Sequence, residues 1–157
     1  MEFNIEVEAD SNQNLEPVSI LTKSNIDSLG RSYGTGKRKT SIARVWIKKG
    51  AGKVVINKKD LTKYFSFAKY QVVVNQPFVT TDAVGKYDVF CTVLGGGISS
   101  QAEAIAHGIS KALSVHNPEA YHRVLRSTGL LTRDDRIVER KKPGRKKARK
   151  RFQFSKR

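Results

Sequence analysis

The residues best suited to chemistry in this sequence are the cations gathered at its C-terminus. Residues 140–157 contain eleven Lys and Arg side chains and no Asp or Glu. Like charges at this density cannot pack together without counter-ions, so the segment suits a polyanion rather than a core. Phe152 and Phe154 alternate with polar residues, and exposed rings can stack on unpaired bases. We expect residues 140–157 to be disordered alone and ordered on RNA.

Two glycine-rich segments could also bind phosphate. Gly95–Gly97 precedes a predicted helix, whose N-terminus carries partial positive charge. A dinucleotide motif would need a third Gly where Ser100 stands, so we expect a tight turn or a contact with an RNA phosphate. Gly34–Arg38 is similar to a P-loop, but Arg31 and Arg38 occupy positions that require Gly and Ser or Thr. We interpret it as a flexible basic segment suited to a phosphate backbone.

The other reactive side chains predict no catalytic or metal-binding set. The three histidines lack a carboxylate or Cys partner at ligand spacing. Cys91 is the single cysteine and lies in an apolar run, where a buried thiol is expected. Asp134 and Asp135 stand between two arginines and favour ion pairing over acid–base chemistry. We therefore expect no enzyme, no metal and no cofactor.

The charge of the chain is large and unevenly distributed. Its 157 residues carry a net charge of +16, which attracts nucleic acid or, as a rival, an anionic membrane surface. Residues 1–30 instead hold six acids and one base without helical or strand periodicity, and we expect a disordered extension there. No apolar run approaches the roughly 20 residues of a membrane span. The start also lacks the pattern of a signal or transit peptide, so a cytoplasmic protein is expected.

Apolar and β-branched runs predict two hairpins in the first part of the chain. Ser41–Ile47 and Lys53–Asn57 flank a turn at residues 48–52, which indicates one hairpin within residues 31–59. Phe78–Val84 and Tyr87–Leu94 indicate a second hairpin that turns near Gly85. Between the hairpins, Asp60 can cap a short helix, and apolar residues from Tyr70 to Val74 repeat at helical spacing until Pro77 ends them.

The clearest helix follows the triple glycine. Ser100 and Glu103 have the spacing of a capping box. Small residues such as Gly108 would let this helix lie close to a sheet. A single apolar stripe is formed by Ile98, Ala102, Ile105, Ile109, Ala112 and Leu113.

One further helix and the order of the elements complete the predicted fold. Asn117-Pro118 ends the long helix and starts another, which turns Tyr121, Val124 and Leu125 inward and stops at Gly129. Strands, short helices, strands and then helices predict an α+β fold, with a single mixed β-sheet and helices packed on one face. We predict an acidic extension over 1–30, an α+β RNA-binding domain over 31–139 and a basic tail over 140–157.

Four motifs occur in the order typical of one family. They are Tyr33–Ser41, Gly95–Gln101, Arg133-Asp134 with Glu139–Lys142, and Phe152–Arg157. Together they resemble the family of bacterial-type small-subunit ribosomal protein nine, from about Ser32 to Arg157. The chain departs from that family at Ser100 and Glu103, where Gly is frequent, and at Ala106, where Arg is frequent. The loss of a base at Ala106 suggests that the long helix mainly packs.

The resemblance implies a fold like the second domain of ribosomal protein five, with a left-handed crossover and a long basic C-terminal tail. It implies a structural role in the small ribosomal subunit, without a small-molecule substrate. The implied partners are small-subunit ribosomal RNA in the head, peptidyl-site transfer RNA and neighbouring head proteins. The bacterial form makes an organelle ribosome the lesser alternative.

The resemblance also assigns roles to individual residues. Contacts with the anticodon stem-loop of transfer RNA fall to Ser155, Lys156 and Arg157. Contacts with ribosomal RNA fall to Lys37, Arg38, Lys39, Arg44, Arg133, Arg136, Arg140, Lys141, Lys142, Arg145, Lys146, Lys147, Arg149, Lys150 and Arg151. Two other classes remain open from the residues alone: a nucleotide-dependent enzyme that uses the glycine turn, and a general nucleic-acid-condensing protein that uses only the tail.

Overall fold

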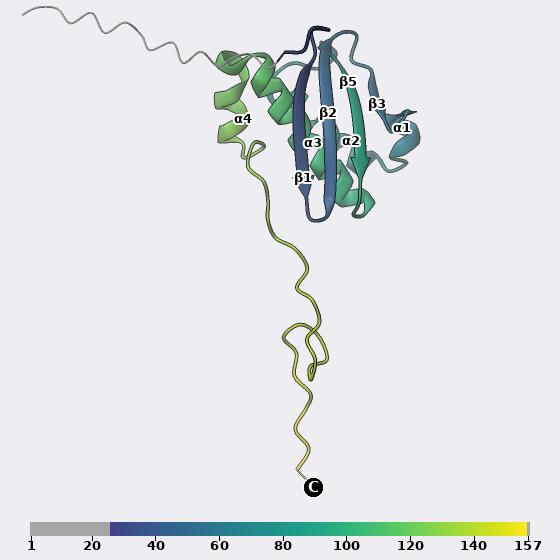
Figure 1. Ribbon diagram of the computed structural model, residues 1–157, viewed down its shortest axis with the longest axis vertical. Helices are drawn as coiled ribbons and strands as arrows, with labels where there is room; N and C mark the ends of the chain where they lie inside the picture. Colours follow the sequence, from purple (N-terminus) through teal and green to yellow (C-terminus); the bar gives the residue numbers. More distant parts are fainter. Residues whose placement is uncertain (1–25, 157) are drawn as a thin grey trace, which may run out of the picture.

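The structure is a computed structural model and describes residues 26–156. A sheet backed by helices forms the folded part, and a long segment leads from it to the C-terminus (Figure 1). The predicted extension over residues 1–30 lies outside the described residues up to position 25. Ile26 pairs with Ser32 through an isolated β-bridge, so the chain is already attached to the sheet at that point.

Within residues 26–156, five strands form one mixed sheet in the order β1-β2-β5-β3-β4. The strands are β1 (Ser32–Arg38), β2 (Ser41–Lys49), β3 (Val54–Ile56), β4 (Lys59–Asp60) and β5 (Tyr87–Leu94). The helices are α1 (Leu61–Tyr64), α2 (Ala68–Thr80), α3 (Ile98–His116) and α4 (Arg123–Ser127), with a π-helical turn η1 (Pro118–His122) before α4. The predicted α+β fold with a mixed sheet is confirmed.

Helices cover one face of the sheet and leave the other face open. Ala43, Val45 and Ile47 of β2 are fully buried, whereas Ile42 and Arg44, which alternate with them, are exposed. Figure 1 shows α2 and α3 behind the sheet, on the side of the buried residues. This alternation is what a one-sided sheet requires.

The first predicted hairpin is wrong in its pairing. β2 pairs antiparallel with β1 and with β5, whereas β3 pairs parallel with β5 and does not touch β2 in the ladder. The segment Gly34–Arg38, predicted to be flexible, belongs to β1. Its glycines give it little intrinsic strand preference, so its partner decides its conformation. A tight turn at Lys39, whose φ is +49°, joins β1 to β2.

A parallel crossover links β3 to β5 through α1 and α2. Two parallel neighbouring strands need such a connection, because the chain must return to the starting edge of the sheet before the second strand begins, and a tight turn is too short for that. In Figure 1 both strands run downwards, β5 lies to the left of β3, and α2 lies behind the sheet. That arrangement makes the crossover left-handed, as the resemblance implies and against the usual handedness of such units.

Pro77 does not end α2, which continues to Thr80. The strand predicted over Phe78–Val84 is therefore wrong, while the strand predicted over Tyr87–Leu94 is confirmed as β5. Proline removes one backbone donor and disfavours a helix interior. Here the side chains of Pro77 and Phe78 are buried against the domain, and that burial offsets the lost hydrogen bond in the last turn.

Helix α3 lies against β1 with its backbone close to that of the strand. A Cβ on Gly36 would meet the backbone of Ala104 and Gly108, and a Cβ on Gly34 would meet Gly108 and Ala112. The predicted close approach at Gly108 is confirmed, and these glycines are required by contact rather than by φ. The predicted stripe is buried except at Ile98, which is 54% exposed at the first residue of the helix.

The predicted cap at the start of α3 is wrong, whereas the predicted cap at Asn117, after α3, is confirmed. Gly97, not Ser100, caps α3, and the Ser100 hydroxyl accepts a hydrogen bond from the Gly97 amide at 3.0 Å. At the other end Asn117 accepts from the amide of Ala120 at 3.3 Å, as a cap should. Leu125 of α4 is buried as expected, whereas Val124, predicted to face inward, is exposed.

Candidate nucleic-acid interface

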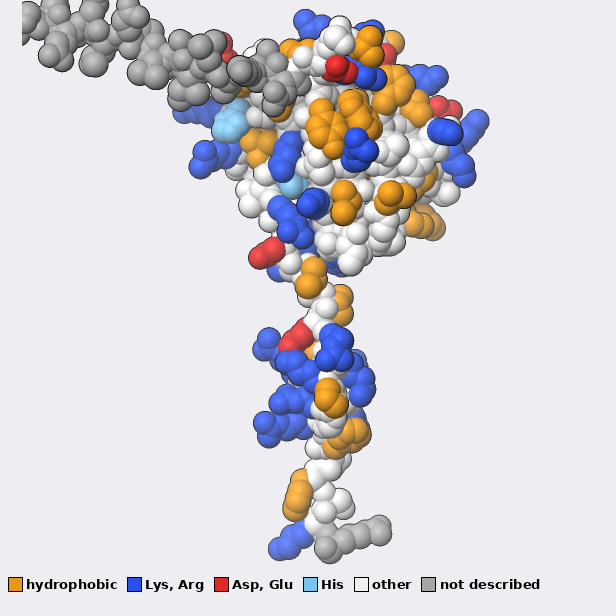
Figure 2. Space-filling view, in the orientation of Figure 1, with side chains coloured by type: hydrophobic (Ala, Val, Ile, Leu, Met, Phe, Trp, Pro, Cys, Tyr) orange, Lys and Arg blue, Asp and Glu red, His pale blue; other side chains and the backbone are white. Residues whose placement is uncertain are grey.

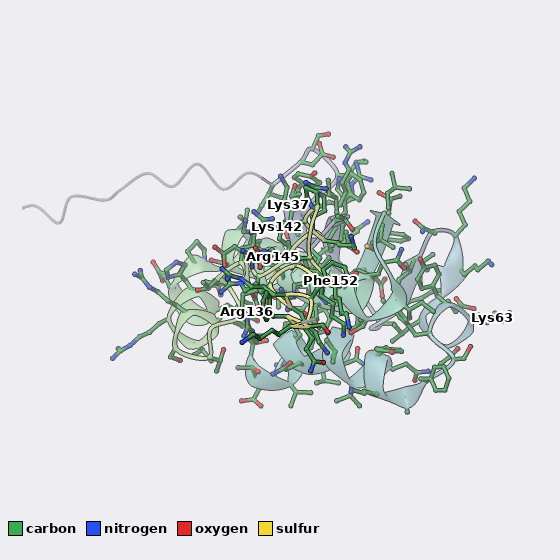
Figure 3. The ribbon with its side chains drawn as sticks, turned by 90° about the horizontal axis from the view of Figure 1, so that it is seen from below. Lys37, Lys63, Arg136, Lys142, Arg145 and Phe152 are labelled. Carbon is green, nitrogen blue, oxygen red and sulfur yellow. The ribbon has the colours of Figure 1, made fainter. Side chains whose placement is uncertain are left out.

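The basic segment at the C-terminus has no helix or strand over residues 140–156. In Figure 1 it runs away from the domain, and Figure 2 shows Lys and Arg side chains crowded along it. Nearly all of its predicted RNA-binding bases are exposed, and only Arg145 is half-buried, where it donates to the Arg149 carbonyl at 3.1 Å. Figure 3 looks along the tail, so that Lys142, Arg145 and Phe152 are projected onto the domain in this view, while Lys63 on α1 points away at the edge of the domain.

Glu139 is the acid closest in sequence to these bases, and it bonds two of them. Its carboxylate accepts from Lys142 at 2.8 Å and from Arg149 at 2.9 Å. These two bonds lower the pKa of Glu139 below its ordinary value. The Lys146 ammonium lies 5.7 Å from the centroid of the Phe152 ring, a cation–π contact. The start of the basic segment is thus folded on itself through exposed charges, which contribute little stability.

Arg38 binds the stretch of chain that leads from the helices of the domain into this segment. Its guanidinium pairs with the carboxylate of Glu103 on α3 and with that of Asp134 at 3.1 Å, and only 14% of its side chain is exposed. It also donates to the carbonyl of Arg136 at 3.0 Å. We name Arg38, Glu103 and Asp134 the tail latch. Ion pairing at Asp134 was predicted, but the latch gives Arg38 an intramolecular contact where an RNA contact was expected.

The Asp134 carboxylate also binds a second guanidinium. Arg136 bonds it at 2.7 Å through Nη2 and donates its backbone amide at 3.0 Å. The hydrogen bonds from Arg136 and the charge of Arg38 hold the pKa of Asp134 well below its usual range. Asp134 is therefore ionised at any pH at which the protein would work.

The other predicted RNA-binding bases of the domain are exposed at two places. Lys37 and Lys39 stand at the β1–β2 turn, and Arg133 and Arg136 stand where the chain leaves α4. Hydrogen bonds of Arg38 to the carbonyls of Asp134 and Arg136 bring these two places together. Arg44 lies apart from them, on the open face of the sheet. No contact with RNA is tested by these positions, so the assignments stay predictions.

The remaining candidates of the sequence have structural surroundings. Gly95 and Gly96 adopt φ of +75° and +62° in a tight turn, and the Gly97 amide is already bonded to Ser100. Burial raises the pKa of the Cys91 thiol to about 12, which makes it unreactive. Between residues 26 and 156 no group of three or more His, Cys, Asp or Glu could hold a metal ion. None of the helices in that range combines the length and apolar character that crossing a bilayer demands.

A row of aromatic side chains on the open face of the sheet was not predicted from the sequence. Tyr33 of β1 is the register partner of Trp46 on β2, and Trp46 is the partner of Phe90 on β5. The rings of Tyr33 and Trp46 have centroids 5.3 Å apart. The signal was the alternation of buried and exposed positions within each strand, but it aligns these residues only once the pairing of the strands is known.

Comparison with known proteins identifies the relationship. The profile of the family described as Ribosomal protein S9/S16 matches residues 36–157, which is most of the chain. The chain belongs to this family. The S9/S16 match includes β1 from Gly36 onward, the sheet, the helices and the whole basic segment, so the resemblance drawn from the four motifs is confirmed.

Individual S9/S16 relatives match over almost their full length. The protein named small ribosomal subunit protein uS9 of Rickettsia peacockii is 57% identical over 143 residues, which cover 90% of this chain and 89% of the relative. The uS9 protein of Rickettsia prowazekii is 54% identical over 145 residues, or 92% of this chain and 89% of the relative. These alignments reach beyond the four-fifths of the chain that the motifs covered, so they include part of the segment before Ser32.

Proposed function

We propose that this chain is a structural constituent of the bacterial small ribosomal subunit that binds ribosomal RNA in the head of that subunit. The role in the small subunit rests on membership of the S9/S16 family and on uS9 relatives that align over nine-tenths of the chain. The chain has no enzymatic function in this role. It works in the cytoplasm, within the ribosome, beside other proteins of the head.

The observation that carries the RNA-binding part is the run of exposed bases in residues 140–156, with no acid among them. RNA helices repel one another as they converge, and fixed cations between them remove that repulsion. Each phosphate that is neutralised releases counter-ions, which makes the affinity depend on salt. The tail therefore supplies affinity without reading sequence, because phosphates carry no sequence information.

The domain, residues 31–139, supplies the position from which the tail starts. Its β1–β2 turn presents Lys37 and Lys39 beside the point where the chain leaves the domain. A rigid domain docked on folded RNA fixes this exit, whereas the tail alone would bind any polyanion. Specificity then comes from the shape of the RNA, as is usual for double-stranded RNA.

The tip of the tail has a separate role in this proposal. Ser155, Lys156 and Arg157 would offer a hydroxyl, an ammonium and a guanidinium to phosphates of the anticodon stem-loop in peptidyl-site transfer RNA. Such contacts hold the transfer RNA whatever its codon. Arg157 lies outside the described residues.

The first test is sedimentation of tagged full-length protein with ribosomal particles through a sucrose gradient after a high-salt wash. Retention with the small subunit alone is expected, because weak phosphate contacts dissociate at high salt. An even spread over all RNA-containing fractions would indicate a general condensing protein and would contradict the proposal.

The role of the tip is tested by Lys156→Ala with deletion of Arg157. Subunits should assemble normally, and their retention of transfer RNA in the peptidyl site should fall. The matched control is the pair Lys63→Ala and Lys69→Ala, which removes the same charge from α1 and α2. Figure 3 shows Lys63 at the edge of the domain, away from the tail. Equal retention in both variants would exclude a functional contact at the tip.

A further inference from the structure

The open face of the sheet carries an aligned set of aromatic side chains. Register pairing places Tyr33, Trp46 and Phe90 side by side on three neighbouring strands. Strands lie about 4.8 Å apart, so the row spans roughly 10 Å across the sheet. Tyr33 is 38% exposed and Phe90 47% exposed, although rings of this size usually lie in a core. In Figure 2, which shows this face, hydrophobic side chains gather over the strands with Lys and Arg beside them.

Arg44 is held over this row. Its guanidinium carbon lies 5.1 Å from the centroid of the Trp46 ring and 5.9 Å from that of Tyr33. The Tyr33 hydroxyl accepts from the Thr35 hydroxyl at 2.9 Å and from Arg44 Nε at 3.4 Å. Arg44, Tyr33 and Trp46 are thus oriented by mutual contacts, and within residues 26–156 the Nη atoms of Arg44 have no hydrogen-bond partner. Such a stacked guanidinium offers both a flat surface and hydrogen-bond donors.

A hollow of about 180 Å³ adjoins the far end of the row. Trp46, Val55 and Phe90 contribute apolar lining, and Lys58 also lines the hollow. The carboxylate of Asp88, two residues before Phe90 on β5, accepts a hydrogen bond from the backbone amide of Lys53 at 2.8 Å. The surface therefore combines flat apolar groups with cations, and the Asp88 carboxylate on β5 is hydrogen-bonded to the backbone.

We propose that Tyr33, Arg44, Trp46 and Phe90 form a stacking platform for unpaired bases of RNA. This inference rests on the proposed function, since it assumes that the partner of the chain is ribosomal RNA. Bases stack on aromatic side chains and on guanidinium planes, and an open sheet with helices on its other face can stack two or three bases in this way. A row of roughly 10 Å suits that number.

Charge favours RNA over a protein as the occupant. Each base that stacks brings a phosphate with it, and Arg44 and Lys58 are placed to meet phosphates along the platform. A protein partner would have to bury Arg44 with an acid of its own, because the Asp88 carboxylate is already bonded to the backbone. The platform thus differs from the Lys and Arg side chains of the tail in the part of RNA that it contacts, which is the base rather than the phosphate alone.

The test uses small subunits that carry the tagged full-length chain. The subunits are washed with high salt, irradiated at a wavelength that joins aromatic side chains to adjacent bases, digested, and searched by mass spectrometry for peptides that carry a nucleotide. We expect adducts on the peptides of β2 and β5 that contain Trp46 and Phe90. Phe90→Ala should abolish the β5 adduct while the subunit retains the protein.

Phe67→Ala is the matched control, because Phe67 is also exposed, at 68%, but lies before α2 and outside the platform. It should leave the adducts on β2 and β5 unchanged. Retained protein with adducts on the tail alone would overturn the platform while the proposed function stands. So would a chemical cross-link from β2 to a neighbouring protein. Protein that is absent from the washed subunits would overturn the proposed function and the platform with it.

Discussion

The domain and the tail carry their positive charge in contrasting ways. In the domain, Arg38 is paired with two acids, and Arg44 is stacked on two rings, so each guanidinium has a fixed direction. In residues 140–156 all the bases but Arg145 are exposed, no acid stands among them, and only Lys142 and Arg149 pair with a carboxylate, that of Glu139. Fixed groups can discriminate between shapes, whereas free cations bind any dense array of phosphates. We infer that the tail provides affinity and the domain provides selectivity.

Removal of residues 140–157 tests this division most strongly. If each of the eleven bases neutralises one phosphate, truncation should reduce the slope of log affinity against log salt by about 8 to 10. Filter binding to head-domain ribosomal RNA at several salt concentrations would measure it. A tail with the same residues in scrambled order should restore the slope. An unchanged slope after truncation would show that the domain, not the tail, carries the affinity.

Gly36→Ala tests the domain without touching its charge. A Cβ at this position meets the backbone of Ala104 and Gly108, which cannot move as a flexible side chain can. We expect a loss of about 3 kcal/mol in the free energy of unfolding, measured with urea on the full-length chain. Gly97→Ala, where the Cβ has open space, should cost less than about 1 kcal/mol.

Gly36→Ala also separates selectivity for folded RNA from overall affinity for RNA. Gly36→Ala should weaken binding to folded head RNA while the salt slope set by the tail persists, because the tail does not depend on the fold of the sheet. If the variant lost binding to all RNA equally, the division between domain and tail would be wrong.

Sequence patterns predicted the elements whose own residues decide them. Helix α3 was found from its apolar stripe, and β5 from its alternation. By contrast β1 was missed, because Gly34 and Gly36 hide a strand that exists through its contact with α3. Pro77 was taken as a helix end, although burial of its side chain keeps α2 intact. Prediction from local residue preferences failed where tertiary contacts outweighed those preferences.

The candidate nucleic-acid interface also has a part that the sequence predicts and a part that depends on tertiary contacts. The tail was predicted because its charge is contiguous in the sequence. The tail latch was not, since Arg38 meets residues 65 and 96 positions away, and no spacing rule joins them. The stacking platform required the pairing of β2 with both of its neighbours, which the predicted hairpins had wrong.

The platform can be probed in solution because Trp46 is the single tryptophan of the chain. A short single-stranded RNA should quench its fluorescence, since bases stack on the ring. An abasic strand of equal length should bind the tail equally and leave the fluorescence unchanged. Phe90→Ala should raise the RNA concentration needed for half-maximal quenching about tenfold, which is equivalent to about 1.4 kcal/mol of binding free energy. Equal quenching by the abasic strand would mean that Trp46 senses charge and not stacking.

Asp134→Asn should have the smallest effect of these variants on stability and RNA binding. Whether it strengthens or weakens RNA binding distinguishes between two explanations. The substitution removes the carboxylate that joins Arg38 and Arg136 at the start of the tail. Hydrogen exchange of residues 131–139 should become faster, while unfolding by urea changes little. The lowered pKa of Asp134 means that its ionised form favours folding, and this contribution is lost only as the pH falls below the ordinary value of 3.8. The latch should therefore persist unchanged from pH 5 to 8.

For RNA binding by Asp134→Asn, the change in net charge and the loss of the tail latch are expected to act in opposite directions. Asp134→Asn raises the net charge by one, which by itself strengthens binding to a polyanion. Loss of the latch frees the tail to point in many directions, which weakens binding to folded head RNA. Asp135→Asn makes the same change of charge beside the latch and should only strengthen binding. If both variants strengthened it equally, the direction of the tail would be set by the RNA and not by Arg38.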